Sequence, residues 1–141
     1  MGLLSKILGG TPDYPQLQPD MTAAQQLKAI RTNLEELTRE VKEPMEVVPG
    51  ELSAYVFIGK PPKRFGIAWI EDDQIKSFKS VVAEQNVSQQ MLNKVSDDLR
   101  EAYKRHDDAT RYQTKVGDRE ITVTPSEALK DEVRSILTSL H

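Results

Sequence analysis

A regular stripe of apolar residues between Thr22 and Glu43 limits the folds open to this chain more than any other feature. The apolar positions recur at intervals of three and four: Leu27, Ile30, Leu34, Leu37 and Val41. This spacing puts them on one face of an α-helix. Thr22 and Gln25 fit a capping box at its start, and Pro44 would stop it. The sequence therefore predicts one long amphipathic N-terminal helix over 22–43.

The stripe has the a/d spacing of a coiled coil, which leaves two interpretations of its role. In one, the helix packs on a sheet of its own chain. In the other, it pairs with a second copy and forms a dimer through those five residues. The stripe is shorter than the three to four heptads typical of a coiled coil, and only Arg31 and Glu40 add charge at its flanks. Packing on the chain's own core is the favoured interpretation.

Two segments rich in aromatic and β-branched residues, Leu52–Ile58 and Phe65–Ile70, are typical of strands. The loop between them, 59–64, contains two prolines. Pro49-Gly50 upstream indicates a turn. The simplest arrangement is an antiparallel hairpin.

Three further helices are predicted downstream. The first covers Asp73–Glu84, and the second runs from Asn86 or Ser88 to about Arg105. The third follows Thr124, which we expect to be its N-cap, with a proline and a glutamate in the next three positions.

A second hairpin is predicted between the last two helices, from Tyr112–Val116 and Glu120–Val123 joined through Gly117-Asp118. The expected order is α-ββ-α-α-ββ-α. Strands never alternate singly with helices, so we expect an α+β fold with antiparallel pairing. The prolines in 11–19 indicate an extended linker, so residues 1–19 are expected to form a flexible arm and 20–141 a single domain.

The composition narrows the possible chemistry. The 141 residues include no cysteine, which excludes disulfides and thiolate ligands, and the net charge of −3 disfavours nucleic acid as a partner. No apolar run approaches the ~20 residues of a membrane-spanning helix, and the first ten residues fit neither a signal peptide nor a myristoylation motif. These features favour a bacterial-type cytoplasmic protein, and no motif implies a cofactor.

Two acidic clusters are candidate sites. His106, Asp107 and Asp108 offer a nitrogen and two carboxylates to a divalent metal, although adjacent side chains at a helix end point in different directions. The alternative for this cluster is a solvated helix end. Glu71–Asp73 precedes a helix, where helix capping is the favoured interpretation over an acidic active site.

Basic residues surround the two prolines of the 59–64 loop: Lys60, Lys63 and Arg64. Their charge suits an acidic partner protein, or single-stranded nucleic acid stacked on neighbouring aromatic residues. The simpler alternative is a solvated hairpin tip, which is favoured.

The N-terminal arm carries apolar residues that are candidates for contact with a partner or a membrane surface: Leu3, Leu4, Ile7 and Leu8. A single lysine there is too little charge for anchoring to a membrane. We therefore expect a non-catalytic interaction or accessory protein. The alternatives are a small enzyme or ligand-binding protein with a carboxylate–metal site, and a weak single-strand binder through the basic loop.

Overall fold

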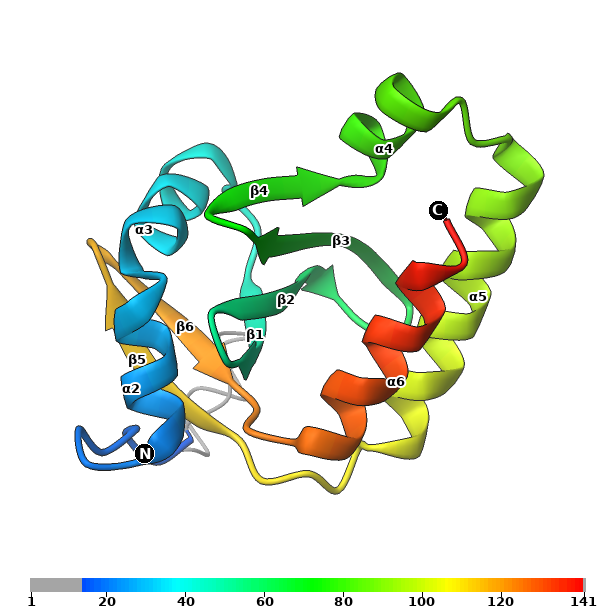
Figure 1. Ribbon diagram of the computed structural model, residues 1–141. Coiled ribbons are helices and arrows are strands. Elements are labelled where there is room, and N and C mark those ends of the chain that lie inside the picture. The colour runs from blue at the N-terminus through cyan, green and yellow to red at the C-terminus, as the bar shows by residue number, and fades with distance from the viewer. Residues whose placement is uncertain (1–13, 141) are drawn as a thin grey trace.

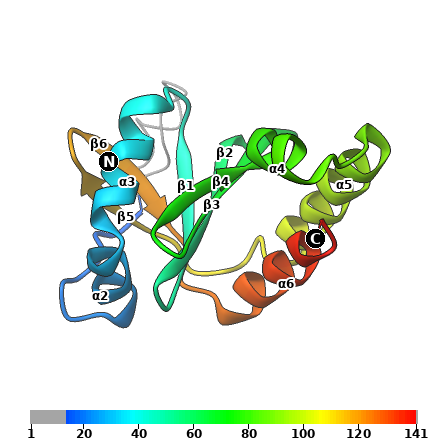
Figure 2. The ribbon, with the colours of Figure 1, turned by 45° about the horizontal axis from the view of Figure 1, so that its top comes forward.

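A six-stranded sheet lies between two layers of helices in the computed structural model, which describes residues 14–140 (Figure 1). The strands are β1 (Met45–Gly50), β2 (Ser53–Lys60), β3 (Arg64–Glu71), β4 (Gln74–Ser77), β5 (Tyr112–Val116) and β6 (Arg119–Val123). The helices are α2 (Thr22–Ala29), α3 (Arg31–Glu40), α4 (Phe78–Gln85), α5 (Gln89–Arg105) and α6 (Glu127–Thr138). Helices α2 and α3 cover one face, and α5 and α6 cover the other, as the rotated view also shows (Figure 2).

The strand order is β4-β3-β2-β1-β6-β5, so an antiparallel meander is joined to an antiparallel hairpin. The junction is a parallel pairing in which Glu46 of β1 lies opposite Thr122 and Val47 lies opposite Val123. The presence of both helices and a sheet confirms the predicted α+β class. Antiparallel pairing is confirmed at every junction between the strands described except this central one.

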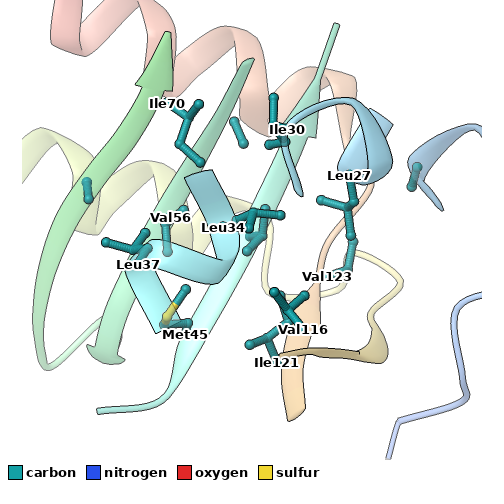
Figure 3. Packing of buried hydrophobic residues seen from close by; sticks show 14 residues of the cluster. Leu27, Ile30, Leu34, Leu37, Met45, Val56, Ile70, Val116, Ile121 and Val123 are labelled. Atoms are coloured by element: carbon teal, nitrogen blue, oxygen red, sulfur yellow. The ribbon is translucent and has the colours of Figure 1, made fainter. Parts of the chain in front are cut away.

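The apolar stripe packs on the sheet face below α2 and α3. Leu34 is completely buried, and Leu27, Ile30 and Leu37 expose 7% or less of their surface. Figure 3 shows these side chains pointing onto strand residues that include Val56. The stripe therefore packs into this chain's own core. Removal of its apolar surface from water stabilises the fold.

The prediction of one long helix over 22–43 is wrong. The chain leaves helical geometry at Ile30, where φ is −117° and ψ is 22°, and α3 ends before Val41. A straight helix of that length would diverge from a twisted sheet, whereas two short helices can each follow it. The predicted capping box is also absent, because Met21 is the N-cap and its side chain makes no capping bond.

The predicted element order is wrong as well, because two strands were missed. The segment with Pro49-Gly50 is not simply a turn but belongs to β1, buried along its whole length. Residues 74–77, expected to be helical, form β4, and helix α4 begins only after Ser77. Ser77 caps α4 by accepting a hydrogen bond from the Ser80 amide. The predicted helix start, Asp73, lies in the turn between β3 and β4.

The second half of the chain follows the sequence pattern more closely. Ser88 caps α5 by accepting from the Met91 amide, and α5 ends at Arg105 as predicted. Strands β5 and β6 form the expected hairpin. The N-cap of α6 is Ser126 rather than Thr124. The apolar faces of α5 and α6 cover the second face of the sheet, which carries Trp69.

Part of the segment predicted to be a linker pairs with the sheet. Gln113 of β5 donates its amide to the Pro15 carbonyl and accepts from the Leu17 amide, each over 2.9 Å. Gln16 thereby forms a parallel bridge to Gln113. Residues 15–17 thus cover the outer edge of β5. Among the helices of residues 14–140, none has the length and apolar character needed to cross a membrane.

Candidate functional site

An open strand edge is the starting point of the candidate site. β3 is eight residues long, but β4 pairs only with its second half, from Ala68 to Glu71. The first half, Arg64–Ile67, pairs with β2 on one side, and no other described segment pairs with it on the other. Unpaired backbone amides and carbonyls along a strand can accept an additional strand.

A groove of about 650 Å³ runs beside this edge, and we call it the α3–β3 groove. Its apolar or small lining residues are Leu37, Val41, Pro44, Ile58, Gly59, Phe65, Gly66, Ile67, Ala68 and Ile75. Its polar lining residues are Glu40, Glu43, Lys60, Arg64 and Ser77. The groove exists because α3 ends at Glu40, before it has covered this part of the sheet.

Two glycines shape the groove differently. A Cβ atom added to Gly66 would meet no atom within 4 Å, so the space above this residue is open. Gly59 adopts φ +109°, and an added Cβ would lie 2.9 Å from the Arg64 carbonyl oxygen. Glycine is required at position 59 for the backbone to turn there. At position 66 the missing side chain leaves room for a ligand.

Charged residues lie at the rim of the groove. Lys60 and Arg64 face each other across the β2–β3 pair, while Glu40 and Glu43 come from the end of α3 and the segment after it. The predicted basic cluster is therefore present at the hairpin tip, where Lys63 is also exposed. No ion pair of these three cations is found within residues 14–140. They are free to meet an anionic group.

The hairpin tip is held by Arg100 of α5. Its Nε–H donates to the Pro62 carbonyl over 2.8 Å, and its guanidinium lies 5.6 Å from the centre of the Phe65 ring. These contacts fix the loop from the opposite face of the sheet. The open edge and the cations are thus presented on a supported loop.

A buried polar cluster around Glu46 was missed by the sequence analysis. The carboxylate accepts hydrogen bonds from Tyr103 over 2.6 Å, from Arg111 over 3.0 Å and from Thr124 over 2.5 Å. Burial raises the pKa of Tyr103, and Glu46 raises it further. Because these groups satisfy one another, we assign the cluster a structural role.

His106 lies at the end of α5 as predicted, but its ring bonds to Glu132 of α6 rather than to the neighbouring acids. Asp107 and Asp108 are exposed. Within residues 14–140, no three His, Asp or Glu side chains are grouped closely enough to hold a metal ion. The structure therefore does not bring the metal-site candidates together.

The remaining residues predicted to contact a partner belong to the N-terminal arm and to the apolar stripe. Leu3, Leu4, Ile7 and Leu8 lie outside the described residues. The five residues proposed for a dimer lie in or against this chain's core, so a second copy would have to displace them from the sheet.

The sequence did not lead us to the groove residues Gly66 and Ala68. The signal was an alternation along β3 between small residues on one face and Phe65, Ile67 and Trp69 on the other.

Comparison with family models, with curated proteins and with solved structures found no match to this chain. The geometry of the open edge and its groove is therefore the basis for a functional proposal.

Proposed function

We propose that this protein is a non-catalytic interaction domain that binds an extended segment of a partner protein along the open edge of β3. The observation that carries the proposal is the unpaired stretch Arg64–Ile67 beside an apolar groove of about 650 Å³. Addition of a strand is a recurring mode of peptide recognition, in which main-chain bonds give affinity and side-chain pockets give specificity.

The bound segment would continue the line of β4 beside the first half of β3. Its backbone would pair with Arg64–Ile67, and alternate side chains would point to the same face as Gly66. That face carries Ile58 and Ala68, which lie opposite Gly66 or two residues along from it. The open space above Gly66 is the natural position for one apolar side chain.

The same molecule already uses this type of pairing at its other side. Residues 15–17 add to β5 through the two hydrogen bonds of Gln113. The β5 edge is therefore covered by the chain itself, while the first half of β3 has no such segment among residues 14–140. This contrast supports β3 as the edge for a partner.

The charges at the rim indicate the partner's chemistry. An acidic residue of the segment would meet Lys60 and Arg64, and apolar residues would fill the groove. A basic residue would suit Glu40 and Glu43, which also line the groove. Such charge complementarity contributes more to orientation and association rate than to affinity.

A random peptide library tests the proposal, with peptides of about twelve residues, long enough to form a strand of ordinary length. We expect selection of peptides that alternate apolar residues and carry an acidic residue. In NMR spectra, binding should shift the amides of Arg64–Ile67 and slow their hydrogen exchange. Selected peptides that shift only amides far from β3 would contradict the proposal.

Gly66→Leu is the blocking variant. It adds a side chain where the structure has open space, so folding should be retained while peptide affinity falls at least about tenfold because the groove is filled. Ala83→Leu adds a bulky residue to the exposed surface of α4, outside the groove, and should not change affinity. Equal affinities for both variants would overturn the proposed site.

Replacing Lys60 and Arg64 together with glutamate tests the charge assignment. Affinity for the acidic peptides should fall, and its dependence on salt concentration should weaken, because the attractive pair is removed. Unchanged affinity and salt dependence would show that these cations do not contact the peptide.

A further inference from the structure

A second cavity, of about 410 Å³, lies at a different place on the molecule from the α3–β3 groove. The β1–β2 turn, the β3–β4 turn and the last part of α6 surround it. Tyr55 and Trp69 lie within it, and they are direct partners in the β2–β3 register. We call it the Tyr55–Trp69 pocket.

Two largely buried residues of this pocket, Tyr55 and Trp69, have polar groups without a protein partner in the described part of the chain. Tyr55 exposes 8% of its surface and Trp69 exposes 2%, yet neither the hydroxyl nor the indole N–H has a hydrogen-bond partner within residues 14–140. In that part of the chain, every side-chain nitrogen or oxygen shut off from solvent does have one. Solvent therefore reaches both groups, and both residues line the same cavity.

The two groups are suited to donate hydrogen bonds. An indole nitrogen can only donate. Burial raises the pKa of the Tyr55 hydroxyl; Arg134 opposes this effect, and Glu71 and Asp131 add to it. Tyr55 is therefore protonated at neutral pH. A ligand carrying an acceptor would replace the water that these two donors reach through the pocket.

Charged side chains of both signs surround these donors. Arg134 lines the pocket, and its guanidinium makes no ion pair or hydrogen bond with any residue of 14–140. Three carboxylates line it too, those of Glu51, Glu71 and Asp72, again without an ion pair in the described chain. A ligand with an anionic group alone would meet the three acids, and a cation alone would leave the donors unused.

We propose that the Tyr55–Trp69 pocket binds a free α-amino acid. Its carboxylate would accept from the Tyr55 hydroxyl, the Trp69 indole N–H and Arg134, and its ammonium group would face the acidic side chains. The apolar walls Leu52 and Leu137 would contact its side chain. A volume of about 410 Å³ is within the range of small-molecule sites.

The conformation of Leu52 supports a ligand at this place. Leu52 adopts φ +56° and exposes 68% of its surface at the edge of the pocket. A left-handed conformation is costly for leucine, and here the exposed side chain gains little from burial. A bound ligand would give that side chain an apolar contact.

Trp69 supplies the measurement, because it is the only tryptophan in the sequence. Its fluorescence should change saturably on titration of the full chain with one or more of the protein amino acids. For L-leucine, the matched probes are 4-methylpentanoate, which lacks the ammonium group, and 3-methylbutylamine, which lacks the carboxylate. Whichever amino acid binds best should be compared with its own two such analogues.

We expect each analogue to bind at least about tenfold more weakly than the amino acid, since it loses a charged hydrogen-bonded group. The proposal is overturned if none of the amino acids gives a saturable change up to about 10 mM. Equal binding of the amine would also overturn it, and would make the pocket a cation site. Equal binding of the carboxylate would make it an anion site.

Tyr55→Phe and Arg134→Ala should each weaken amino-acid binding about tenfold. The matched controls are Tyr112→Phe and Arg39→Ala, which remove the same groups outside the pocket and should leave affinity unchanged. Similar losses for a variant and its control would contradict the assignment. Gly66→Leu changes the α3–β3 groove and not this pocket, so it should retain amino-acid affinity. A negative result for one proposal therefore does not contradict the other.

Discussion

Arg111 donates its Nε–H to the Oε2 atom of Glu46 over 3.0 Å, which ties the residue before β5 to β1 across 65 positions of sequence. Both side chains are almost completely shielded from water, with 8% and 11% exposed. The same guanidinium donates to the carbonyls of Asp107 and Ala109. One ion pair thus orders the turn between α5 and β5.

Removing one partner of this pair should destabilise the protein strongly. Arg111→Ala leaves the Glu46 carboxylate buried without its counter-charge, which costs roughly 3–5 kcal/mol in comparable sites. Urea unfolding followed by circular dichroism would measure the change in the free energy of unfolding.

The matched control removes both charges and keeps the volume, as Glu46→Leu with Arg111→Met. We expect the double variant to be more stable than Arg111→Ala alone, since no unpaired charge remains. A single variant that loses less than about 1 kcal/mol would show that the Glu46 charge is solvated in solution.

Leu52 should be replaceable by glycine with a gain in stability. Its left-handed backbone costs a leucine about 1–2 kcal/mol, and its exposed side chain contributes little. Leu52→Gly should therefore raise the free energy of unfolding by up to about 1 kcal/mol after the entropy of the unfolded glycine is included. Leu52→Ala, which retains the strained backbone, should not. Destabilisation by glycine would argue that the turn is not strained.

Local sequence patterns correctly predicted the elements that are marked by a hydrophobic period, a capping residue or a turn residue. The stripe from Leu27 to Leu37 points into the core, Ser88 starts α5, and the turn at Gly117 joins β5 to β6. In each case the information lies within about ten residues of sequence. Such local signals do not depend on where the rest of the chain is.

The missed features depend on distant partners. β1 contains Glu46 and a proline, which argue against a buried strand until Arg111, Tyr103 and Thr124 are seen to satisfy the carboxylate. β4 was hidden because Ile75 also fits a helical period.

The candidate site was only partly predictable for the same reason. Lys60 and Arg64 stand out in sequence, but the open edge arises from the difference in length between β3 and β4. That difference is known only after β4 has been identified as a strand. The Tyr55–Trp69 pocket likewise requires the register that puts these residues opposite each other.

The carboxyl group of Glu132 should make the free energy of unfolding depend on pH in the acidic range. Hydrogen bonds from Arg105 and, to a smaller extent, from His106 lower the pKa of its carboxyl. Since the folded pKa lies below the unfolded value of about 4.3, this contribution is complete above that pH and is lost as pH falls through the folded value.

The difference in unfolding free energy between the original chain and Glu132→Gln should therefore be largest near neutral pH. It should shrink below about pH 4 and stay under about 1 kcal/mol, because the group is partly exposed. Urea unfolding between pH 3 and pH 7 would measure it. Glu36→Gln, at an exposed position of α3, should show no such trend. A difference that grows in acid would contradict the assignment.

Gly59 and Gly66 should respond oppositely to the same substitution, although both lie in the β2–β3 hairpin. Gly59→Ala forces a side chain onto φ +109° and to within 2.9 Å of a carbonyl oxygen, so it should cost about 2 kcal/mol or more. Gly66→Ala meets open space in an ordinary strand conformation and should be neutral or stabilise by up to about 1 kcal/mol. Thermal and urea unfolding of the two variants side by side provide the measurement. Comparable losses at both positions would mean that the space above Gly66, on which the peptide site depends, is not open in solution.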